Sequence, residues 1–185
     1  KRPGDGPMAS WGYPLVSKSG RIYMLYSQHI GRVDNFPHHT GWLHGIFSDD
    51  NGATWSAPQN IPLRRSIRDN PDATMPPNIL CWQKPNRLGK DGKYFAGVTR
   101  WSSFAVTPNP TKAWISADSH VEFMRFENID ANPEPKDIQI SWFAFNEKAL
   151  SVPFPGHPEV SACQEPTVVK LPDGRLFCTL RTASG

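Results

Sequence analysis

Histidines gather in one short stretch of the chain, where a ring nitrogen could act as a general base. The stretch holds four of the 6 histidines within sixteen positions, among polar neighbours: His29, His38, His39 and His44 lie with Tyr26, Gln28, Arg32 and Asp34. An imidazole changes its charge near neutral pH, so it can accept a proton from a substrate under physiological conditions. The residue types therefore permit proton abstraction.

A base of this kind suits a polysaccharide lyase, which removes the proton beside a uronate carboxylate. In such a reaction an Arg or Gln neutralises the carboxylate and a Tyr acts as the acid. We single out His29, which ends a predicted strand, as the candidate base, and Gln28 as a substrate contact. A catalytic and a purely structural role suit His29 equally. For His38 and His39 we favour a solvated loop without a chemical role.

Other side chains could bind ligands, but each has a simpler interpretation. The histidine stretch could bind zinc in principle, yet its spacing matches no His-Glu-x-x-His helix and no cysteine is near. The segment Asp69-Asn70-Pro71-Asp72 could bind calcium, but it is equally a turn. Trp82 and Trp101 could stack on sugar rings, although such tryptophans more often belong to a core. The sequence therefore predicts no metal and no cofactor.

Composition excludes several classes of protein. The formal net charge is +3, from 20 Lys and Arg against 17 Asp and Glu, which is too small to indicate binding to nucleic acid or to a membrane surface. The 19 prolines exclude a helix bundle, because each interior proline removes a backbone hydrogen bond from a helix. No stretch is apolar enough to span a bilayer.

The cysteines give little information about the compartment. Cys81, Cys163 and Cys178 form no Cys-x-x-Cys pair. We interpret them as three buried free thiols, while one disulfide with a spare thiol stays open. A secreted or periplasmic location is favoured but undecided.

A strand–turn–strand unit repeats along the chain. Its copies lie at residues 13–26, 78–98 and 165–180. Their turns contain Gly20, Gly92 and Gly174, because a tight hairpin turn needs the positive φ that glycine adopts readily. We expect the turn of the last copy to be two residues longer than that of the first. Further strands are predicted at 41–47, 121–126 and 138–145, and loops at 108–110, 133–135 and 153–158.

The spacing of these turns predicts an all-β fold of propeller type. Consecutive turn glycines are 72 and 82 residues apart, which leaves room for about four strands in each unit. We divide the chain into blade-like units at 8–65, 66–150 and 151–185. A propeller needs about four to eight blades to close, so we expect these units to be part of a larger ring. The alternative is an open sandwich of similar hairpins.

One motif resembles a known family. Ser48-Asp49-Asp50-Asn51-Gly52-Ala53-Thr54-Trp55 is similar to the Asp box, Ser-x-Asp-x-Gly-x-Thr-Trp, of the sialidase (neuraminidase) superfamily. Such a turn satisfies its own hydrogen-bonding groups: the Asp accepts backbone N–H groups, the Gly adopts the left-handed backbone conformation and the Trp packs beneath. The resemblance implies a six-bladed β-propeller, of which this chain covers two to three blades. It also implies a structural role for Asp50, since Asp boxes lie away from the sialidase active site.

A second stretch resembles the sialidase catalytic region. It runs from Gln164-Glu165-Pro166-Thr167-Val168-Val169 through Gly174-Arg175-Leu176 to Arg181. The resemblance implies that Glu165 partners a catalytic tyrosine outside this chain, that Arg181 grips a sugar carboxylate, and that Asp34 is the acid/base. A guanidinium suits this role because it forms two parallel hydrogen bonds with a carboxylate. The alternative for Glu165 and Arg181 is a surface ion pair.

The chain also departs from the family. Gly12-Tyr13-Pro14 stands where sialidases have Arg-Ile-Pro, and His29 stands where they often carry an arginine. We therefore expect a sialidase-type exo-glycosidase acting on an acidic glycan, and keep two alternatives. One is a lyase or rhamnosidase on a similar propeller that uses His29 as its base. The other is a non-catalytic glycan-binding propeller. In each case the partner is a carbohydrate, with no nucleic acid and no membrane span.

Overall fold

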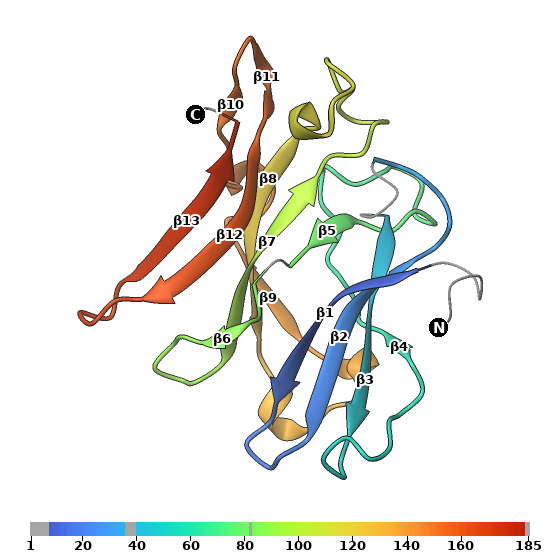
Figure 1. The fold of residues 1–185 in the computed structure, drawn as a ribbon, viewed down its shortest axis with the longest axis vertical. Helices are drawn as coiled ribbons and strands as arrows, with labels where there is room; N and C mark the ends of the chain where they lie inside the picture. The colour runs from blue at the N-terminus through green and yellow to red at the C-terminus, as the bar shows by residue number, and fades with distance from the viewer. Residues whose placement is uncertain (1–7, 36–39, 82, 184–185) are drawn as a thin grey trace.

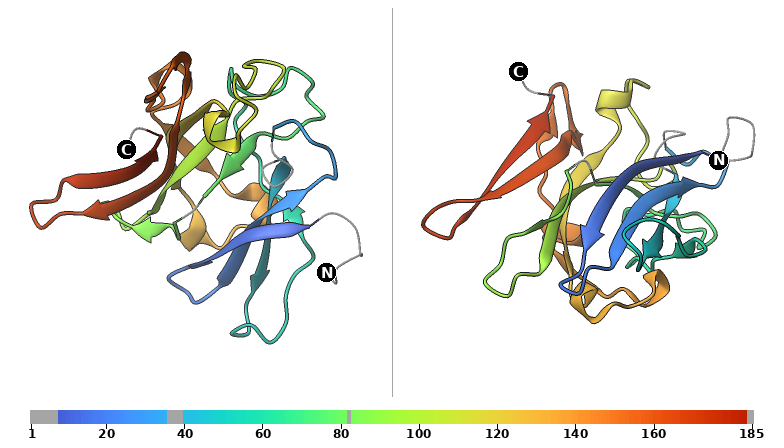
Figure 2. Two further views of the ribbon diagram at one scale, coloured as in Figure 1. Left: turned by 45° about the horizontal axis from the view of Figure 1, so that its top comes forward. Right: turned by 60° about the horizontal axis from the view of Figure 1, so that its bottom comes forward.

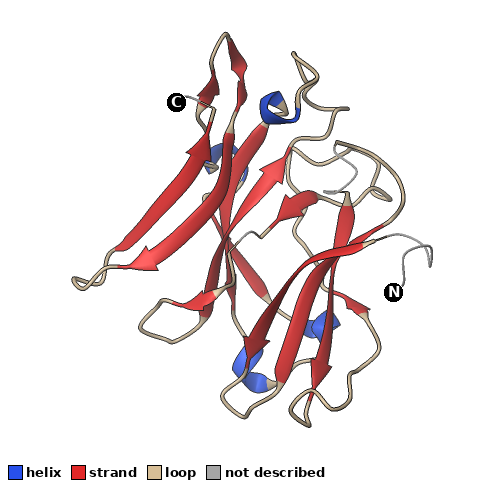
Figure 3. Cartoon of the chain, in the orientation of Figure 1, coloured by secondary structure: helices blue, strands red, loops and turns tan. Residues whose placement is uncertain are grey.

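The computed structural model describes residues 8–35, 40–81 and 83–183, and its regular structure is almost entirely β-strand (Figure 3). The helices in this part of the chain are 3-10 turns of three residues each: η1 (Trp114–Ser116), η2 (Ile129–Ala131), η3 (Pro135–Asp137) and η4 (Asn146–Lys148). None of these described helices has the length or apolar character to cross a membrane. The all-β prediction is confirmed.

The first sheet follows chain order and is antiparallel throughout (Figure 1). Its strands are β1 (Ala9–Val16), β2 (Ile22–His29), β3 (Gly41–Ser48) and β4 (Gln59–Asn60). Burial alternates strictly along β2, where Tyr23 and Leu25 are fully buried. Successive side chains of a strand point to opposite faces, so one face of this sheet covers a core.

The second sheet is more deeply buried than the first. Its strand order is β5-β7-β8-β9, with β6 also paired to β7. The strands are β5 (Asn78–Leu80), β6 (Asn86–Arg87), β7 (Tyr94–Trp101), β8 (Ser119–Phe126) and β9 (Ile140–Phe143). Both faces of β7 are covered along most of its length. Figure 2 shows why: this sheet lies between the first sheet and the hairpin formed by β12 (Cys163–Lys170) and β13 (Leu176–Thr182).

The core joins the first two sheets. Leu15 and Leu25 come from the first sheet, and Val98 and Met124 come from the second. Each of these four side chains is fully buried. Burying one such side chain contributes about 1.5–3 kcal/mol, so this cluster fixes the first sheet against the second.

Two short sheets complete the described chain. One pairs β12 (Cys163–Lys170) with β13 (Leu176–Thr182), and the other pairs β10 (Pro153–Phe154) with β11 (His157–Ser161). The prediction of a loop at 153–158 is therefore wrong. A hairpin forms there because Gly156 takes a φ of 80° between the paired residues Phe154 and His157. The prolines are tolerated in so short a ladder, which needs few backbone donors.

The first and last copies of the repeat have the same turn. The N–H of Ser17 donates to the carbonyl oxygen of Arg21 at 2.9 Å, and the N–H of Leu171 donates to that of Arg175 at 2.8 Å. Gly20 and Gly174 both have positive φ, 100° and 88°. The two turns therefore have the same length, and the prediction that the last turn is two residues longer is wrong. The error came from aligning the two copies on their prolines. In the paired strands Pro14 lies opposite Met24 and Val168 lies opposite Cys178, so the residue equivalent to Pro14 is Val168 and not Pro166.

The Asp-box turn follows β3 and satisfies its own hydrogen-bond groups. Asp50 accepts hydrogen bonds from the Ser48 hydroxyl at 2.7 Å and from the Thr54 N–H and hydroxyl at 2.8 and 2.6 Å. The Trp55 indole donates to the carbonyl oxygen of Gly52 at 3.1 Å. Trp55 is 42% exposed, so it lies across the turn and not beneath it. Asp50 thereby has the structural role expected of it.

The three cysteines are free thiols. Cys81 and Cys163 are buried, as expected, whereas Cys178 is only half-buried on β13. Within residues 8–35, 40–81 and 83–183 the sheets follow one another in chain order, and none of them closes on itself.

Candidate functional site

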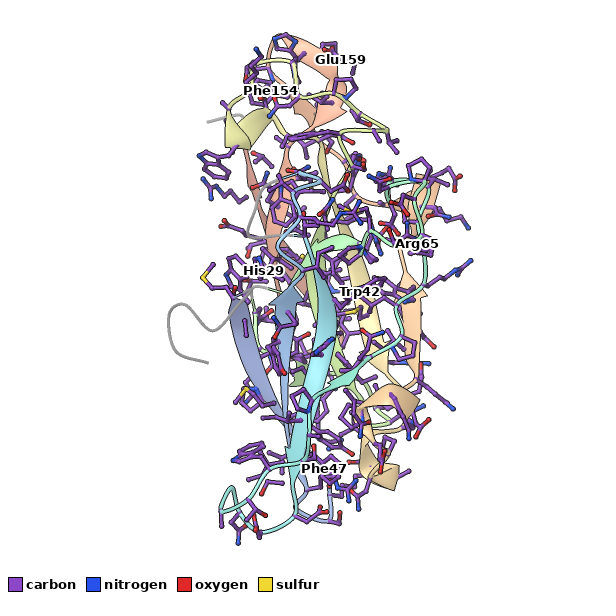
Figure 4. All side chains as sticks on the ribbon, turned by 90° about the vertical axis from the view of Figure 1, so that its right-hand side faces the viewer. His29, Trp42, Phe47, Arg65, Phe154 and Glu159 are labelled. Carbon is purple, nitrogen blue, oxygen red and sulfur yellow. The ribbon has the colours of Figure 1, made fainter. Side chains whose placement is uncertain are left out.

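Most of the predicted functional residues lie at one end of the sheets, which we call the polar end. His29 ends β2, Glu165 lies near the start of β12, and Arg181 lies near the end of β13. The arrowheads of β7 and β13 point to this end in Figure 1. Isolated bridges join the sheets there, between Thr40 and Asn78 and between Ser119 and Ala162. The Asp box follows the opposite end of β3, near Phe47, which Figure 4 places far from Phe154 and Glu159.

Glu165 and Arg181 contact each other directly. The Nη1 atom of Arg181 lies 2.7 Å from Oε1 of Glu165, and both side chains are partly exposed, 40% and 31%. The guanidinium also lies 4.4 Å above the ring of Trp114. In the part of the chain that the structure describes, this arginine makes no hydrogen bond through Nε or Nη2. The result is a positioned guanidinium with one open edge.

A β-bulge brings this pair together. Gln164 pairs with Arg181 and Thr167 with Thr179, so the register shifts between them. Glu165 lies within the bulge with a φ of 50°, a left-handed conformation that is uncommon for a residue with a Cβ. Its N–H donates to the Thr99 hydroxyl at 2.9 Å, which anchors it to β7. The bulge thus redirects the Glu165 side chain toward the neighbouring strand.

Asp34 holds several segments together. Its Oδ1 accepts hydrogen bonds from Asn70 at 2.6 Å and from the Ser103 hydroxyl at 2.7 Å, and its Oδ2 accepts one from Asn78 at 2.9 Å. Its N–H donates to the Thr40 hydroxyl at 3.2 Å. The residue is only 7% exposed. This geometry gives Asp34 an anchoring role and leaves little access for a substrate.

His29 is packed against the first strand. Its Nε2 lies 3.0 Å from the Ser10 hydroxyl, and its ring stacks on Trp11 with centroids 6.2 Å apart. The residue is 6% exposed. The neighbouring Gln28 side chain donates to backbone carbonyl oxygens of His29 and Met8 at 3.2 and 3.4 Å. Both residues therefore act in packing in this structure. His38 and His39 lie outside the described residues.

Of the two tryptophans considered as sugar platforms, Trp101 has the core position that the sequence analysis favoured. Trp101 is 1% exposed and packs with Leu80 and Ala117, so it offers no face to a sugar and belongs to the core. Trp82 lies outside the described residues. Trp114, which sequence reasoning missed, is 45% exposed and carries the Arg181 guanidinium. Its position beside the proline-containing loop at 108–110 was the available signal.

A buried charge cluster supports the polar end. Arg100 binds Asp69 through Nη1 at 2.7 Å and Glu122 through Nε at 2.8 Å, and all three side chains are at most 1% exposed. Asp69 also accepts a hydrogen bond from the N–H of Ser66 at 2.7 Å. Because Asp69 is committed to these partners, it does not form the calcium site considered above. Among the described residues no cluster of three His, Cys, Asp or Glu side chains could hold a metal ion.

Sequence reasoning also missed a second group of polar side chains at this end. Asp118, His120 and Ser151 line a cleft of about 350 Å³ together with Arg68. The available signal was Asp118-Ser119-His120, because residues two apart on a strand point to the same face. The signal from Ser151 was absent, since it comes from a distant loop.

Comparison with known proteins adds no family. A scan against protein-family models and a search of the curated proteins both find no match to this chain. The likeness to sialidases therefore depends on the Asp box at Ser48–Trp55 and on the stretch from Gln164 to Arg181.

Proposed function

We propose that the chain forms blades of an Asp-box β-propeller and that the protein is a sialidase-type exo-glycosidase acting on an acidic sugar. One observation carries the proposal: Arg181 is held by Glu165 and Trp114, while its Nε–Nη2 edge makes no hydrogen bond to any residue that the structure describes. The repeated hairpins and the self-satisfied Asp-box turn support the choice of propeller class.

The open edge of Arg181 suits a carboxylate. A guanidinium edge donates two parallel N–H bonds to the two oxygens of a carboxylate, which fixes both position and orientation. Contact with Glu165 and Trp114 restricts the arginine side chain before the ligand arrives, so less conformational entropy is lost on binding. A sialic acid presents such a carboxylate beside its glycosidic carbon.

The catalytic roles follow from this position. Glu165 is partly exposed at the same place and binds Arg181 through Oε1, so we assign it to accept the proton of a tyrosine nucleophile outside this chain. Asp34 anchors the loops in this proposal and is not assigned as the acid/base, because its carboxylate is buried. A lyase using His29 is disfavoured by the packing of its ring against Trp11.

Product mass on a glycan panel tests the proposal. The panel contains sialylated oligosaccharides and uronic-acid polysaccharides. In the protein that also carries the tyrosine nucleophile, we expect release of free sialic acid with the gain of one water, lost in Arg181→Ala. Arg175→Ala is the matched control, because Arg175 lies on the same hairpin, is exposed and pairs only with a neighbouring Asp173 in the described contacts. Products with a new double bond, or release of sialic acid that Arg181→Ala leaves unchanged, would overturn the hydrolase proposal.

A further inference from the structure

A cleft at the polar end lies apart from the residues assigned to the sugar. Its volume is about 350 Å³, and its walls come from the loop after β7, the start of β8 and the β10–β11 hairpin. Figure 4 labels Phe154 and Glu159 in that hairpin, at one tip of the molecule. Glu165, Arg181 and Trp114 do not line the cleft. Its function is therefore a separate question.

The floor of the cleft holds a histidine fixed by a carboxylate. Nε2 of His120 lies 3.0 Å from both oxygens of Asp118, and both residues are 7% exposed. Asp118 also accepts hydrogen bonds from the Ser102 hydroxyl and from the N–H of Ser161, the latter at 2.8 Å. Burial alone would raise the pKa of Asp118, but these hydrogen bonds outweigh it and leave the pKa below its ordinary value. The ionised carboxylate then accepts the Nε2 proton and leaves Nδ1 free to accept another.

A serine hydroxyl faces the other ring nitrogen. Oγ of Ser151 lies 2.7 Å from Nδ1 of His120, closer than the 3.2 Å to the carbonyl oxygen of Ala149. Ser151 is exposed on the cleft wall, so a substrate can reach it. A hydroxyl, a base that accepts its proton and a carboxylate that orients the base form the constellation of an activated nucleophile. Two separate segments contribute its members: Asp118 and His120 lie at the start of β8, and Ser151 lies in the loop before β10.

The remaining walls of the cleft define the ligand. Arg68 brings a guanidinium into the cleft, fixed by its Nη1 bond to the carbonyl oxygen of Asn146 at 2.7 Å. Ile67, Val106 and Val160 make part of the wall apolar. A small acyl group suits the apolar wall, and a cation suits the oxyanion that forms when its carbonyl is attacked.

We propose that Ser151, His120 and Asp118 form a second catalytic site, which hydrolyses small acyl esters such as acetyl esters. Ser151 Oγ bonds to the ester carbonyl carbon while its proton passes to Nδ1 of His120. The carbon–oxygen bond to the alcohol then breaks, and His120 returns the proton to the departing alkoxide. Water, deprotonated by His120, attacks the acyl-serine and releases the carboxylic acid and the free serine. Asp118 is a positioning residue, because it acts through His120.

Covalent labelling of the full chain tests this second site. Phenylmethylsulfonyl fluoride sulfonylates an activated serine with loss of fluoride, and peptide mass spectrometry locates the group. We expect labelling at Ser151, none there in Ser151→Ala, and labelling at least about 100-fold slower in His120→Gln, in line with the usual effect of a general base. Hydrolysis of p-nitrophenyl acetate should fall in parallel.

The controls separate catalysis from folding. Ser19→Ala is the matched control, because Ser19 is also an exposed, hydrogen-bonded serine but lies in the turn after β1. It should label and hydrolyse like the original chain. Asp118→Asn should slow labelling while leaving the serine in place. Failure of the folded chain to label at Ser151, or equal labelling in His120→Gln, would overturn the proposal. Because the test uses neither a glycan nor Arg181, it is independent of the glycosidase proposal.

Discussion

Trp11 and Glu165 occupy the same position in two hairpins that lie 154 residues apart. Each lies in a β-bulge on the first strand of its hairpin, with a φ of 51° and 50°. Such a conformation is unfavourable for a residue with a Cβ and persists where surrounding contacts impose it. In the first hairpin the bulge places an indole on His29, and in the last it places a carboxylate on Arg181. The same β-bulge thus positions a different side chain in each of the two hairpins.

Gly97 decides how the last hairpin packs on the second sheet. A Cβ at Gly97 would lie 2.6 Å from both Cβ and Cγ of Pro166, and the proline ring cannot rotate away. We expect Gly97→Ala to lower the free energy of unfolding by about 1–3 kcal/mol, as overpacked cores do. Urea denaturation measures this. Gly12→Ala is the control, since its added carbon would meet the flexible Met24 side chain at 3.3 Å. An equal loss in both variants would contradict the packing argument.

Arg100 should be among the most sensitive positions in the chain. Arg100→Met leaves Asp69 and Glu122 buried without their cation, and breaking a buried ion pair on one side costs about 3–5 kcal/mol. Urea denaturation should show a large shift of the midpoint. Arg175→Met removes an exposed arginine and should leave the midpoint nearly unchanged. Similar midpoints for the two variants would show that the cluster contributes little.

The Asp-box turn should lose its contribution to stability in strong acid. Hydrogen bonds from Thr54 and Ser48 lower the pKa of Asp50 to about 2 in the folded chain. A carboxyl with a lowered folded pKa stabilises the fold above its unfolded pKa, and this stabilisation is lost as the pH falls through the folded value. Asp50→Asn should therefore lower the melting temperature at neutral pH, and the difference should vanish toward pH 2. A difference independent of pH would contradict this assignment.

The thiols should react in order of exposure. Burial raises the pKa of Cys81 to about 12 and that of Cys163 to about 11, so neither forms much of the reactive thiolate at pH 8. Cys178 is half-buried and should react first with Ellman's reagent. Cys81 should react only on unfolding, which mass spectrometry of trapped peptides can locate. Early labelling of Cys81 would show that the core around Tyr13 opens in the native state.

The strands were predictable because their signals are local. Alternating burial along β2 follows from its sequence, and the glycines at 20, 92 and 174 mark turns that form. The hairpin β10–β11 was missed because its prolines suggested a loop, while its single glycine and few backbone pairs suffice for a short ladder.

The candidate site was predictable only in part. Glu165 and Arg181 could be chosen by residue type, but their mutual contact depends on a bulge that shifts the register. Asp34 was chosen as the only acidic residue between the first hairpin and the Asp box, and its burial depends on donors from three other segments. Ser151 and His120 meet across 31 positions, and no local pattern indicates that contact.

A binding titration tests the central claim most directly. N-acetylneuraminic acid and its methyl ester are titrated into the full chain, into Arg181→Ala and into the control Arg175→Ala. The account predicts that the acid binds, and that the ester and the Arg181→Ala variant each lose about 10- to 100-fold in affinity, the amount expected for a charged hydrogen-bonded contact. Equal affinity for the acid and the ester, or unchanged binding in Arg181→Ala, would show that Arg181 does not recognise the carboxylate.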